Sequence, residues 1–236
     1  MRPLETYTHL FFDLDDTLTP SRSLVLPYMG ELLSRLPVDL IAVSGATNEQ
    51  IASQLPNLPF IRLGQNGNHA VDRDGVEVWE KRLNDEEKSA IYAHISELIT
   101  MADFPVADAH DLIEDRLSQI SYSTIGHHAP KEQKHAFDPD SSVRNRMLKT
   151  YPLTNPSVEV RIGGTTCFDY FKVGSNKGSN VREFIQHKGW NFDDCVYFGD
   201  KLMPGGNDET VVGIIDTIPV TSSEDTYQKL SGAFTL

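Results

Sequence analysis

HLFFDLDDTLT, residues 9–19, is an apolar run that breaks directly into three carboxylates. The run predicts a buried strand, and the polar break places Asp13 and Asp15 at its carboxyl end. Open parallel sheets bind ligands at that end. Two carboxylates two residues apart repel each other unless a cation or a shared proton relieves them, and Mg²⁺ prefers such oxygen ligands. The stretch therefore predicts a metal-assisted site; the alternative is an acidic surface loop.

This stretch resembles the opening motif of the haloacid dehalogenase (HAD) superfamily of phosphotransferases. The resemblance implies that Asp13 is the nucleophile that attacks phosphorus to form an aspartyl-phosphate. It implies that Asp15 is the general acid/base and that Thr17 positions the phosphoryl group. A motif match remains a hypothesis until its structural context agrees, so the rest of the chain has to supply that context.

Composition limits the class of protein. A chain of 236 residues can form one large or two modest domains. Its formal net charge of -13 and pI near 4.9 argue against nucleic acid or an anionic membrane surface as a partner. The two cysteines, Cys167 and Cys195, and the absence of an N-terminal apolar run predict a cytoplasmic protein with free thiols.

Strands and helices alternate in the first third of the chain. Buried strands are expected at 9–12, 38–43 and 60–63, with helices at about 25–36 and from Asn48. The first helix would have about four turns with Pro27 in the first one. This alternation predicts a doubly wound, Rossmann-like α/β domain.

Polar residues follow these strands. Ser44 comes directly after the second strand, where its hydroxyl and nearby amides can donate to a phosphate, and it fits the second HAD motif. Thr47 and Gln50 form a capping box for the next helix. Arg22 lies close to the carboxylates and either reaches a substrate phosphate or is a solvated surface residue.

The pattern changes from about Lys81. Asn84 and Glu87 form a capping box that opens a long amphipathic helix. Residues 120–124 alternate as an antiparallel strand with one wet face, a polar loop runs through Pro130 and Pro139, and a helix follows. Two more alternating strands flank Gly163-Gly164. Residues 81–172 are therefore expected to form an α+β domain inserted into a core of residues 1–80 and 173–236.

An insert at this place resembles the cap of an HAD enzyme, of the C2 type. A cap closes over the site, excludes water and contacts the substrate. The alternative is a second domain with an unrelated function.

The returning core carries the remaining candidates. Lys177 stands at a Gly-rich helix start, where it can neutralise a phosphate or the nucleophilic carboxylate, and it matches the third HAD motif. Asp200 ends another buried strand, so two strands would deliver carboxylates to one ion. Asn207 and Asp208 follow a glycine pair and can complete the metal shell directly or through water.

One segment carries a narrower resemblance. FGDKLMPGGNDE at 198–209, with VTSSEDT at 220–226, is similar to eukaryotic-type phosphomannomutases, a capped branch of the HAD superfamily. Gly163-Gly164 with Cys167-Phe168-Asp169, and Gln65-Asn66-Gly67, resemble further motifs of that family. The resemblance spans both domains, and the middle of the cap matches least.

The family resemblance implies further roles. It implies that Arg22, Arg116 and Asp169 contact the sugar phosphate and that the protein forms a homodimer through the cap. It also implies a Mg²⁺ site whose candidate ligands are Asp13, Asp15, Asp200, Asn207 and Asp208.

Four residues depart from the family pattern. Asp16 replaces a glycine and Cys167 a serine that contacts the sugar, while His127 and Lys134 replace cap arginines. A histidine and a lysine hold a second phosphate less firmly than guanidinium groups, which favours hydrolysis of the aspartyl-phosphate. His127, His128 and His135 could instead bind a transition metal, but a solvated loop is the favoured interpretation.

The sequence thus predicts a Mg²⁺-dependent HAD phosphotransferase that acts on hexose phosphates or similar small phosphate esters. A phosphatase is slightly preferred. One alternative is a phosphomannomutase that interconverts mannose 6-phosphate and mannose 1-phosphate, and another is a non-catalytic phosphosugar-binding protein. The choice of substrate depends on cap side chains, where the resemblance is weakest.

Overall fold

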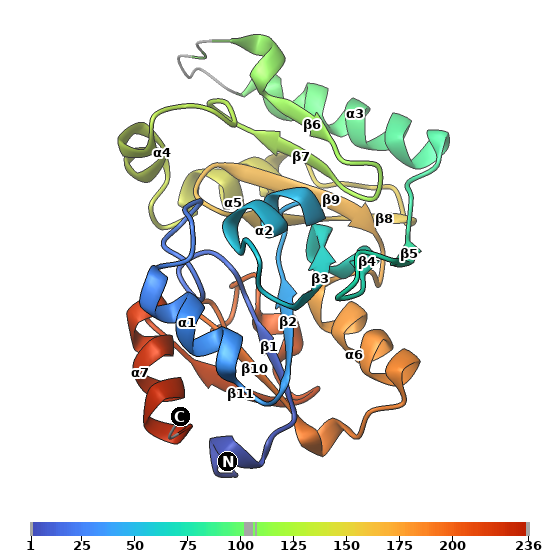
Figure 1. The fold of residues 1–236 in the computed structure, drawn as a ribbon. Coiled ribbons are helices and arrows are strands. Elements are labelled where there is room, and N and C mark those ends of the chain that lie inside the picture. The colour runs from blue at the N-terminus through green and yellow to red at the C-terminus, as the bar shows by residue number, and fades with distance from the viewer. Residues whose placement is uncertain (1, 102–105, 107, 235–236) are drawn as a thin grey trace. The chain divides into compact units, whose positions relative to one another are not determined.

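The computed structural model describes residues 2–101, 106 and 108–234. The chain divides into two compact units, drawn in Figure 1. The first unit comprises residues 1–80 and 175–236, and the second comprises residues 81–174. The sequence places the return to the core at residue 173, two residues before the structural boundary.

The first unit is built on a seven-stranded sheet with the order β11-β10-β1-β2-β3-β4-β5. The doubly wound α/β core expected from the sequence is confirmed, because the five strands from β11 to β3 are parallel. The last two strands form the antiparallel hairpin around Gly75. The strands are β1 (His9–Phe12), β2 (Asp39–Val43), β3 (Phe60–Gly64), β4 (His69–Val71), β5 (Glu77–Glu80), β10 (Cys195–Gly199) and β11 (Asp216–Pro219).

Helices bury both faces of this sheet. Leu10 and Phe12 of β1 pack in one apolar cluster with α1 (Pro27–Arg35), α2 (Asn48–Gln54) and α7 (Ser223–Ala233). Phe11 points to the other cluster, which includes α6 (Lys177–Lys188). Figure 1 shows α1 and α7 side by side. Short 3-10 turns complete the unit: η1 (Leu4–Thr6), η2 (Gln65–Gly67), η4 (Phe192–Asp194) and η5 (Glu209–Val211).

Local signals explain where two of these helices begin. Helix α1 has nine residues and is shorter than the four turns expected, because Leu26 is extended (ψ 142°) and Pro27 is the first helical residue. Helix α2 begins with the expected capping box of Thr47 and Gln50, in which each side chain accepts from the other residue's backbone amide.

The second unit contains a four-stranded antiparallel sheet with the order β6-β7-β9-β8. One sheet face packs Ile120, Tyr122 and Phe168 against Ile91 and Ile95 of the long helix, which begins with the expected capping box of Asn84 and Glu87. The elements are α3 (Asp85–Thr100), η3 (Ala109–Asp111), β6 (Ile113–Asp115), β7 (Ile120–Ser123), α4 (Lys131–Phe137), α5 (Ser142–Thr150), β8 (Val158–Gly163) and β9 (Cys167–Lys172).

Two local expectations for this unit were wrong. The second face of β7 is not wet, because Ser121 and Ser123 are buried. Ser121 Oγ donates to Asp169 Oδ1 at 2.7 Å, and Ser123 Oγ lies 3.0 Å from Thr166 Oγ1, so polar partners within the unit replace water. The polar segment after Pro130 is not a continuous loop either. It contains α4, whose helical residues begin directly after that proline.

Arg144 of α5 forms a buried ion pair and also binds the turn between β8 and β9. Arg144 Nε donates to Asp138 Oδ2 at 2.7 Å, and both side chains are buried. Arg144 Nη1 donates to the carbonyl oxygens of Gly163 and Gly164 at 3.0 and 3.1 Å. A buried guanidinium needs this many acceptors, so it fixes the turn in one conformation.

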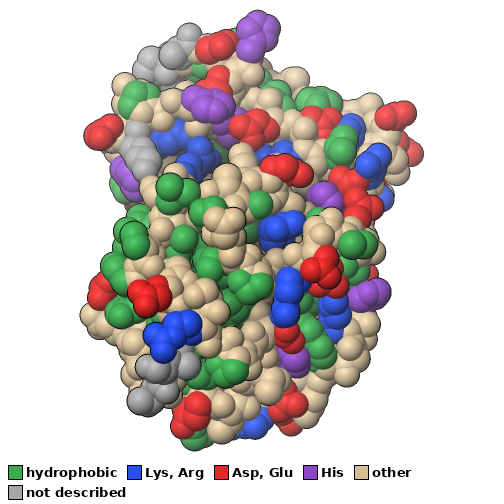
Figure 2. All heavy atoms as spheres, viewed as in Figure 1, with side chains coloured by type: hydrophobic (Ala, Val, Ile, Leu, Met, Phe, Trp, Pro, Cys, Tyr) green, Lys and Arg blue, Asp and Glu red, His purple; other side chains and the backbone are tan. Residues whose placement is uncertain are grey.

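The surface carries side chains of mixed chemical type. Figure 2 shows acidic, basic and hydrophobic side chains interspersed over the face that it draws. Of the helices in the described part of the chain, none has the length and apolar character needed to cross a membrane.

The contact between α6 and η5 gives a stability prediction. A Cβ on Gly178 would lie 1.8 Å from the carbonyl oxygen of Thr210, which is backbone and has little room to move. We expect Gly178→Ala to lower the free energy of unfolding by about 2–3 kcal/mol through overpacking. Gly232→Ala, where nothing lies within 4 Å, should instead be neutral or stabilise α7 by about 0.5 kcal/mol.

Urea unfolding followed by circular dichroism measures both glycine variants. Equal stabilities of the two variants would show that α6 and η5 separate without cost.

Candidate active site

The pairing of β1 with β10 brings the two acidic strand ends together. The strands are parallel, with Phe12 opposite Phe198, and the amide of Asp13 donates to the carbonyl oxygen of Phe198 at 2.9 Å. Asp13 and Asp200 therefore both follow strands that end at the same edge of the sheet. Strand β2 also runs parallel to β1 and places Ser44 at this edge.

A buried lysine links two of the carboxylates. Lys177 is the first residue of α6, where the side chain of Asn176 caps the helix. Its Nζ donates to Asp13 Oδ1 at 2.7 Å and to Asp208 Oδ1 at 2.6 Å. Tyr197 on β10 also donates to Asp208 Oδ1, at 2.7 Å. All four side chains are buried, so these charged groups interact in a medium that screens them weakly.

The cluster fits a hard divalent cation. Asp13, Asp200 and Asp208 each offer an oxygen within 4.8 Å of the others, and no other such group of three occurs in the part of the chain that the structure describes. Asp200 Oδ1 and Asn207 Oδ1 are buried, and neither has a hydrogen-bond partner among the described residues. Buried acceptor oxygens of this kind are costly unless a cation or a water binds them.

The protonation of the cluster follows from its burial. Burial raises the pKa of Asp13 to about 7; Lys177 opposes this rise, and the charges of Asp208 and Asp200 add to it. Burial also raises the pKa of Asp200. Burial alone would lower the pKa of Lys177, but the adjacent Asp13 and Asp208 carboxylates raise it above its ordinary value, so this lysine stays charged.

The loop after β1 is held by its own carboxylates. Asp15 Oδ1 accepts the amide of Arg22 at 2.5 Å, and Asp15 is not part of the three-carboxylate group. Asp16 has a left-handed backbone (φ 61°), which explains why glycine also suits this position, and its Oδ1 accepts the amide of Ser21 at 3.1 Å. Asp16 therefore closes the loop.

Two hydroxyl groups lie at or near this edge. Thr17 is buried, and its Oγ1 has no hydrogen-bond partner within the described residues. An unpartnered buried hydroxyl suits a site that binds a phosphoryl oxygen. Ser44 Oγ accepts the amide of Ala46 at 3.1 Å, which fixes the direction of its side chain.

The second unit gathers most of the remaining candidates on one sheet face. Glu114, Ser121 and Asp169 are opposite one another across β6, β7 and β9. Arg116 donates from Nε and Nη2 to Glu114 Oε2 at 2.9 and 2.5 Å. The other oxygen of Glu114 lies 3.6 Å from His127 Nδ1. Glu114 therefore joins two predicted substrate-binding residues, although the sequence analysis did not single it out.

His127 lies inside this network, so the expectation of a solvated loop was wrong. Only 2% of the residue is exposed, and its Nε2 lies 3.2 Å from the carbonyl oxygen of Ser121. Burial alone would lower the pKa of His127, but the side chains of Cys167 and Glu114 raise it above its ordinary value. Lys134 is buried too and donates to the carbonyl oxygen of His127.

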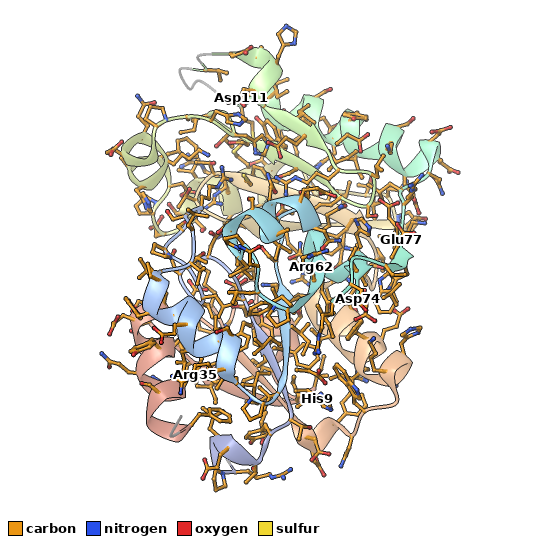
Figure 3. The ribbon with its side chains drawn as sticks, in the orientation of Figure 1. His9, Arg35, Arg62, Asp74, Glu77 and Asp111 are labelled. Atoms are coloured by element: carbon orange, nitrogen blue, oxygen red, sulfur yellow. The ribbon has the colours of Figure 1, made fainter. Side chains whose placement is uncertain are left out.

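Asp111, labelled in Figure 3, fixes the segment that carries this histidine. Its carbonyl oxygen accepts the amide of His127 at 2.9 Å, and its Oδ2 accepts the amide of His128 at 2.8 Å. Gly126 has a φ of +108°, which residues with a side chain rarely adopt, and a Cβ there would lie 2.6 Å from the same Oδ2, so this position favours glycine. The side chain of His128 is 85% exposed, and the described residues contain no histidine group with metal-binding geometry.

Sequence reasoning missed Tyr197, Glu114 and Asp111. Tyr197 directly precedes the segment at 198–209 that carries the family resemblance, and Glu114 lies two residues before Arg116. Both positions were visible as neighbours of candidate residues. The partners of Tyr197 and Asp111 are 11 and 17 residues away, and Glu114 reaches His127 from another segment, so the motifs alone did not indicate these contacts.

Proteins similar in sequence match this chain over both units. A family model described as eukaryotic phosphomannomutase matches residues 43–236, a range that begins after Asp13. A phosphomannomutase from Spinacia oleracea is 30% identical over 240 residues, with 94% of each chain covered. Phosphomannomutase 1 from Dictyostelium discoideum is 27% identical over 245 residues, with 96% of each chain covered.

Solved structures share the fold. A haloacid dehalogenase-like hydrolase from B. subtilis has a TM-score of 0.66 at 12% identity, with 96% of this chain and 100% of that chain covered. A Plasmodium falciparum IMP-nucleotidase has a TM-score of 0.69 at 15% identity, with 98% of this chain and 71% of that chain covered. The fold, the buried acidic edge and these relatives agree: the chain is an HAD-superfamily phosphotransferase and belongs to the eukaryotic phosphomannomutase family.

Proposed function

We propose that this chain is a Mg²⁺-dependent phosphomannomutase that interconverts mannose 6-phosphate and mannose 1-phosphate. The observation that carries the proposal is the buried Lys177–Asp13 pair beside an acidic cluster that fits a cation. The phosphomannomutase relatives, aligned over nearly the whole chain, support the substrate class.

The first half-reaction uses the residues at the edge of the core sheet. A carboxylate oxygen of Asp13 attacks one phosphorus of a hexose bisphosphate, the bond from that phosphorus to its ester oxygen breaks, and Asp15 gives its proton to the leaving oxygen of the hexose monophosphate. Lys177 holds Asp13 in one orientation with its lone pair available. Thr17 and Ser44 donate to the non-bridging oxygens of the phosphoryl group.

The proposed Mg²⁺ ligands are Asp13 and Asp200, with Asn207 and Asp208 bound directly or through water and Asp15 as a further candidate. When bound, Mg²⁺ would neutralise the negative charge that develops on the transferred phosphoryl group. Asp208 already accepts two buried donors on Oδ1, so we expect it to contribute mainly by anchoring Lys177.

In the second half-reaction, the free hydroxyl group of a hexose monophosphate attacks the aspartyl-phosphate, the bond from phosphorus to Asp13 breaks, and Asp15 accepts the hydroxyl proton. The intermediate carries two phosphates and has to be retained while it reorients. We propose that Arg116, His127 and Lys134, on the polar face of the second unit's sheet, bind the second phosphate. Asp169 and Cys167 would contact the sugar from the same face.

Hydrolysis is the second candidate function, and the surroundings of the positively charged side chains in the second unit favour it. Lys134 donates to a backbone carbonyl, and Arg116 is paired with Glu114, so both cations already have internal partners. Weak retention of a bisphosphate would let water attack the aspartyl-phosphate. The preference for a phosphatase drawn from the sequence is not confirmed, since the relatives favour the mutase.

Four further expectations from the sequence stay predictions. They are closure of the cap, a dimer formed through the cap, Arg22 as a phosphate ligand and a cytoplasmic location.

Product analysis tests the proposed function. We expect the protein, given mannose 1-phosphate, Mg²⁺ and a hexose bisphosphate activator, to form mannose 6-phosphate faster than inorganic phosphate. Asp13→Asn should lower turnover by at least about 10³-fold because it removes the nucleophile. ³¹P NMR measures both products. Phosphate release that exceeds isomerisation would favour the phosphatase, and an active Asp13→Asn variant would contradict both enzymatic functions.

The side chains proposed to bind the second phosphate give a second prediction. Replacing His127 and Lys134 together by arginine should raise the ratio of isomerisation to hydrolysis several-fold, because guanidinium groups hold a phosphate through two hydrogen bonds. His128→Arg, on an exposed side chain of the same segment, is the matched control and should leave the ratio unchanged. An unchanged ratio in the double variant would mean that this face does not retain the intermediate.

Metal binding should depend on pH. The pKa of Asp13 without metal is about 7, so protons compete with Mg²⁺ for this carboxylate below that pH. We expect the apparent Mg²⁺ affinity to fall about ten-fold between pH 8 and pH 6. Calorimetric titration without substrate measures it, and equal affinities at the two pH values would show that Asp13 does not bind the ion.

A further inference from the structure

Tyr197 lies in the core beneath the acidic edge, and its hydroxyl makes a specific contact there. The residue is on β10 and is fully buried among the apolar side chains that pack with α6. Its hydroxyl donates to Asp208 Oδ1 at 2.7 Å. Lys177 Nζ donates to the same oxygen at 2.6 Å, so one carboxylate oxygen accepts both a phenol and an ammonium group.

The rest of the Asp208 carboxylate is also confined. Its Oδ2 accepts the amide of Lys201 at 3.3 Å. A Cβ on Gly199 would lie 2.6 Å from that Oδ2 and 2.8 Å from Cε1 of Tyr197, so the carboxylate and the phenol ring both pack against this glycine. A buried carboxylate needs several donors to stay ionised and in one rotamer, and Tyr197 is the uncharged side chain among those donors.

These contacts form one buried chain from Tyr197 through Asp208 and Lys177 to Asp13. We propose that Tyr197 is a positioning residue for phosphoryl transfer: its hydroxyl fixes the Asp208 carboxylate, which holds Lys177 on Asp13. The role rests on the proposed function, because Asp13 is taken as the nucleophile. Without the hydroxyl, Asp208 can rotate toward Lys177 and draw the ammonium group away from Asp13.

A pair of tyrosine variants separates this role from simple packing. Tyr197→Phe keeps the buried ring and removes only the hydroxyl. Tyr7→Phe is the control, because the Tyr7 ring is also buried in the same unit and its hydroxyl donates, at 2.5 Å, to Oδ2 of the exposed residue Asp216. Asp216 is the first residue of β11, which runs parallel to β10. The Tyr7–Asp216 pair therefore lies at the amino ends of the strands, whereas Asp13 lies at their carboxyl ends.

Steady-state kinetics and crystallography of the full chain test the proposal. We expect Tyr197→Phe to lower kcat about ten-fold with KM within two-fold of the unaltered chain, the effect of losing one hydrogen bond to a charged group. Tyr7→Phe should change kcat less than two-fold. The crystal structure of Tyr197→Phe should show Lys177 Nζ displaced from Asp13 Oδ1.

Two results would overturn the proposal. One is a kcat for Tyr197→Phe within two-fold of that for Tyr7→Phe. The other is a crystal structure in which Lys177 still contacts both carboxylates at unchanged distances. The crystallographic result needs no turnover, so a chain inactive on every phosphate ester would refute the proposed function and still leave the position of Lys177 to decide the role of Tyr197.

Discussion

The structure of the candidate active site depends on one buried ammonium group held between two buried carboxylates. Lys177 reaches Asp13 and Asp208, and each of the three would be costly to bury alone. The arrangement is possible only because β1 and β10 are neighbours and α6 begins beside them. Lys201 Nζ lies 3.5 Å from Asp200 Oδ2, so two lysines face the three carboxylates of the cluster. The edge still keeps negative charge, which is why a divalent cation suits it.

In the second unit, the charged groups lie on the polar face of a sheet. Its sheet is apolar on the face that packs against α3 and polar on the other, where Glu114 joins Arg116 to His127. Its cations are therefore oriented by internal acceptors before any phosphate arrives. Such preorganisation favours specific binding, but the second phosphate of the proposed reaction would have to compete with Glu114 for Arg116. Under the proposed function, the balance between isomerisation and hydrolysis would depend on this competition.

Local patterns predicted the elements that local physics controls. The alternating strands and helices of the first unit occur close to where the sequence places them, and both capping boxes are present. The errors came where distant groups decide the outcome. Ser121 looked solvent-facing because its partner, Asp169, is 48 residues away, and His127 looked like a loop residue because Asp111 and Ser121 hold it from outside its own segment.

The sequence by itself determined which carboxylates end buried strands, because an apolar run followed by charge has few alternatives in a folded chain. It could therefore place Asp13 and Asp200 at a sheet edge before any contact was known. Only the tertiary structure decided which group neutralises them and what orients that group. Tyr197, Asp208 and Lys177 meet through strand order and helix packing, and hydrogen bonds between such distant residues leave no periodic signal in the sequence.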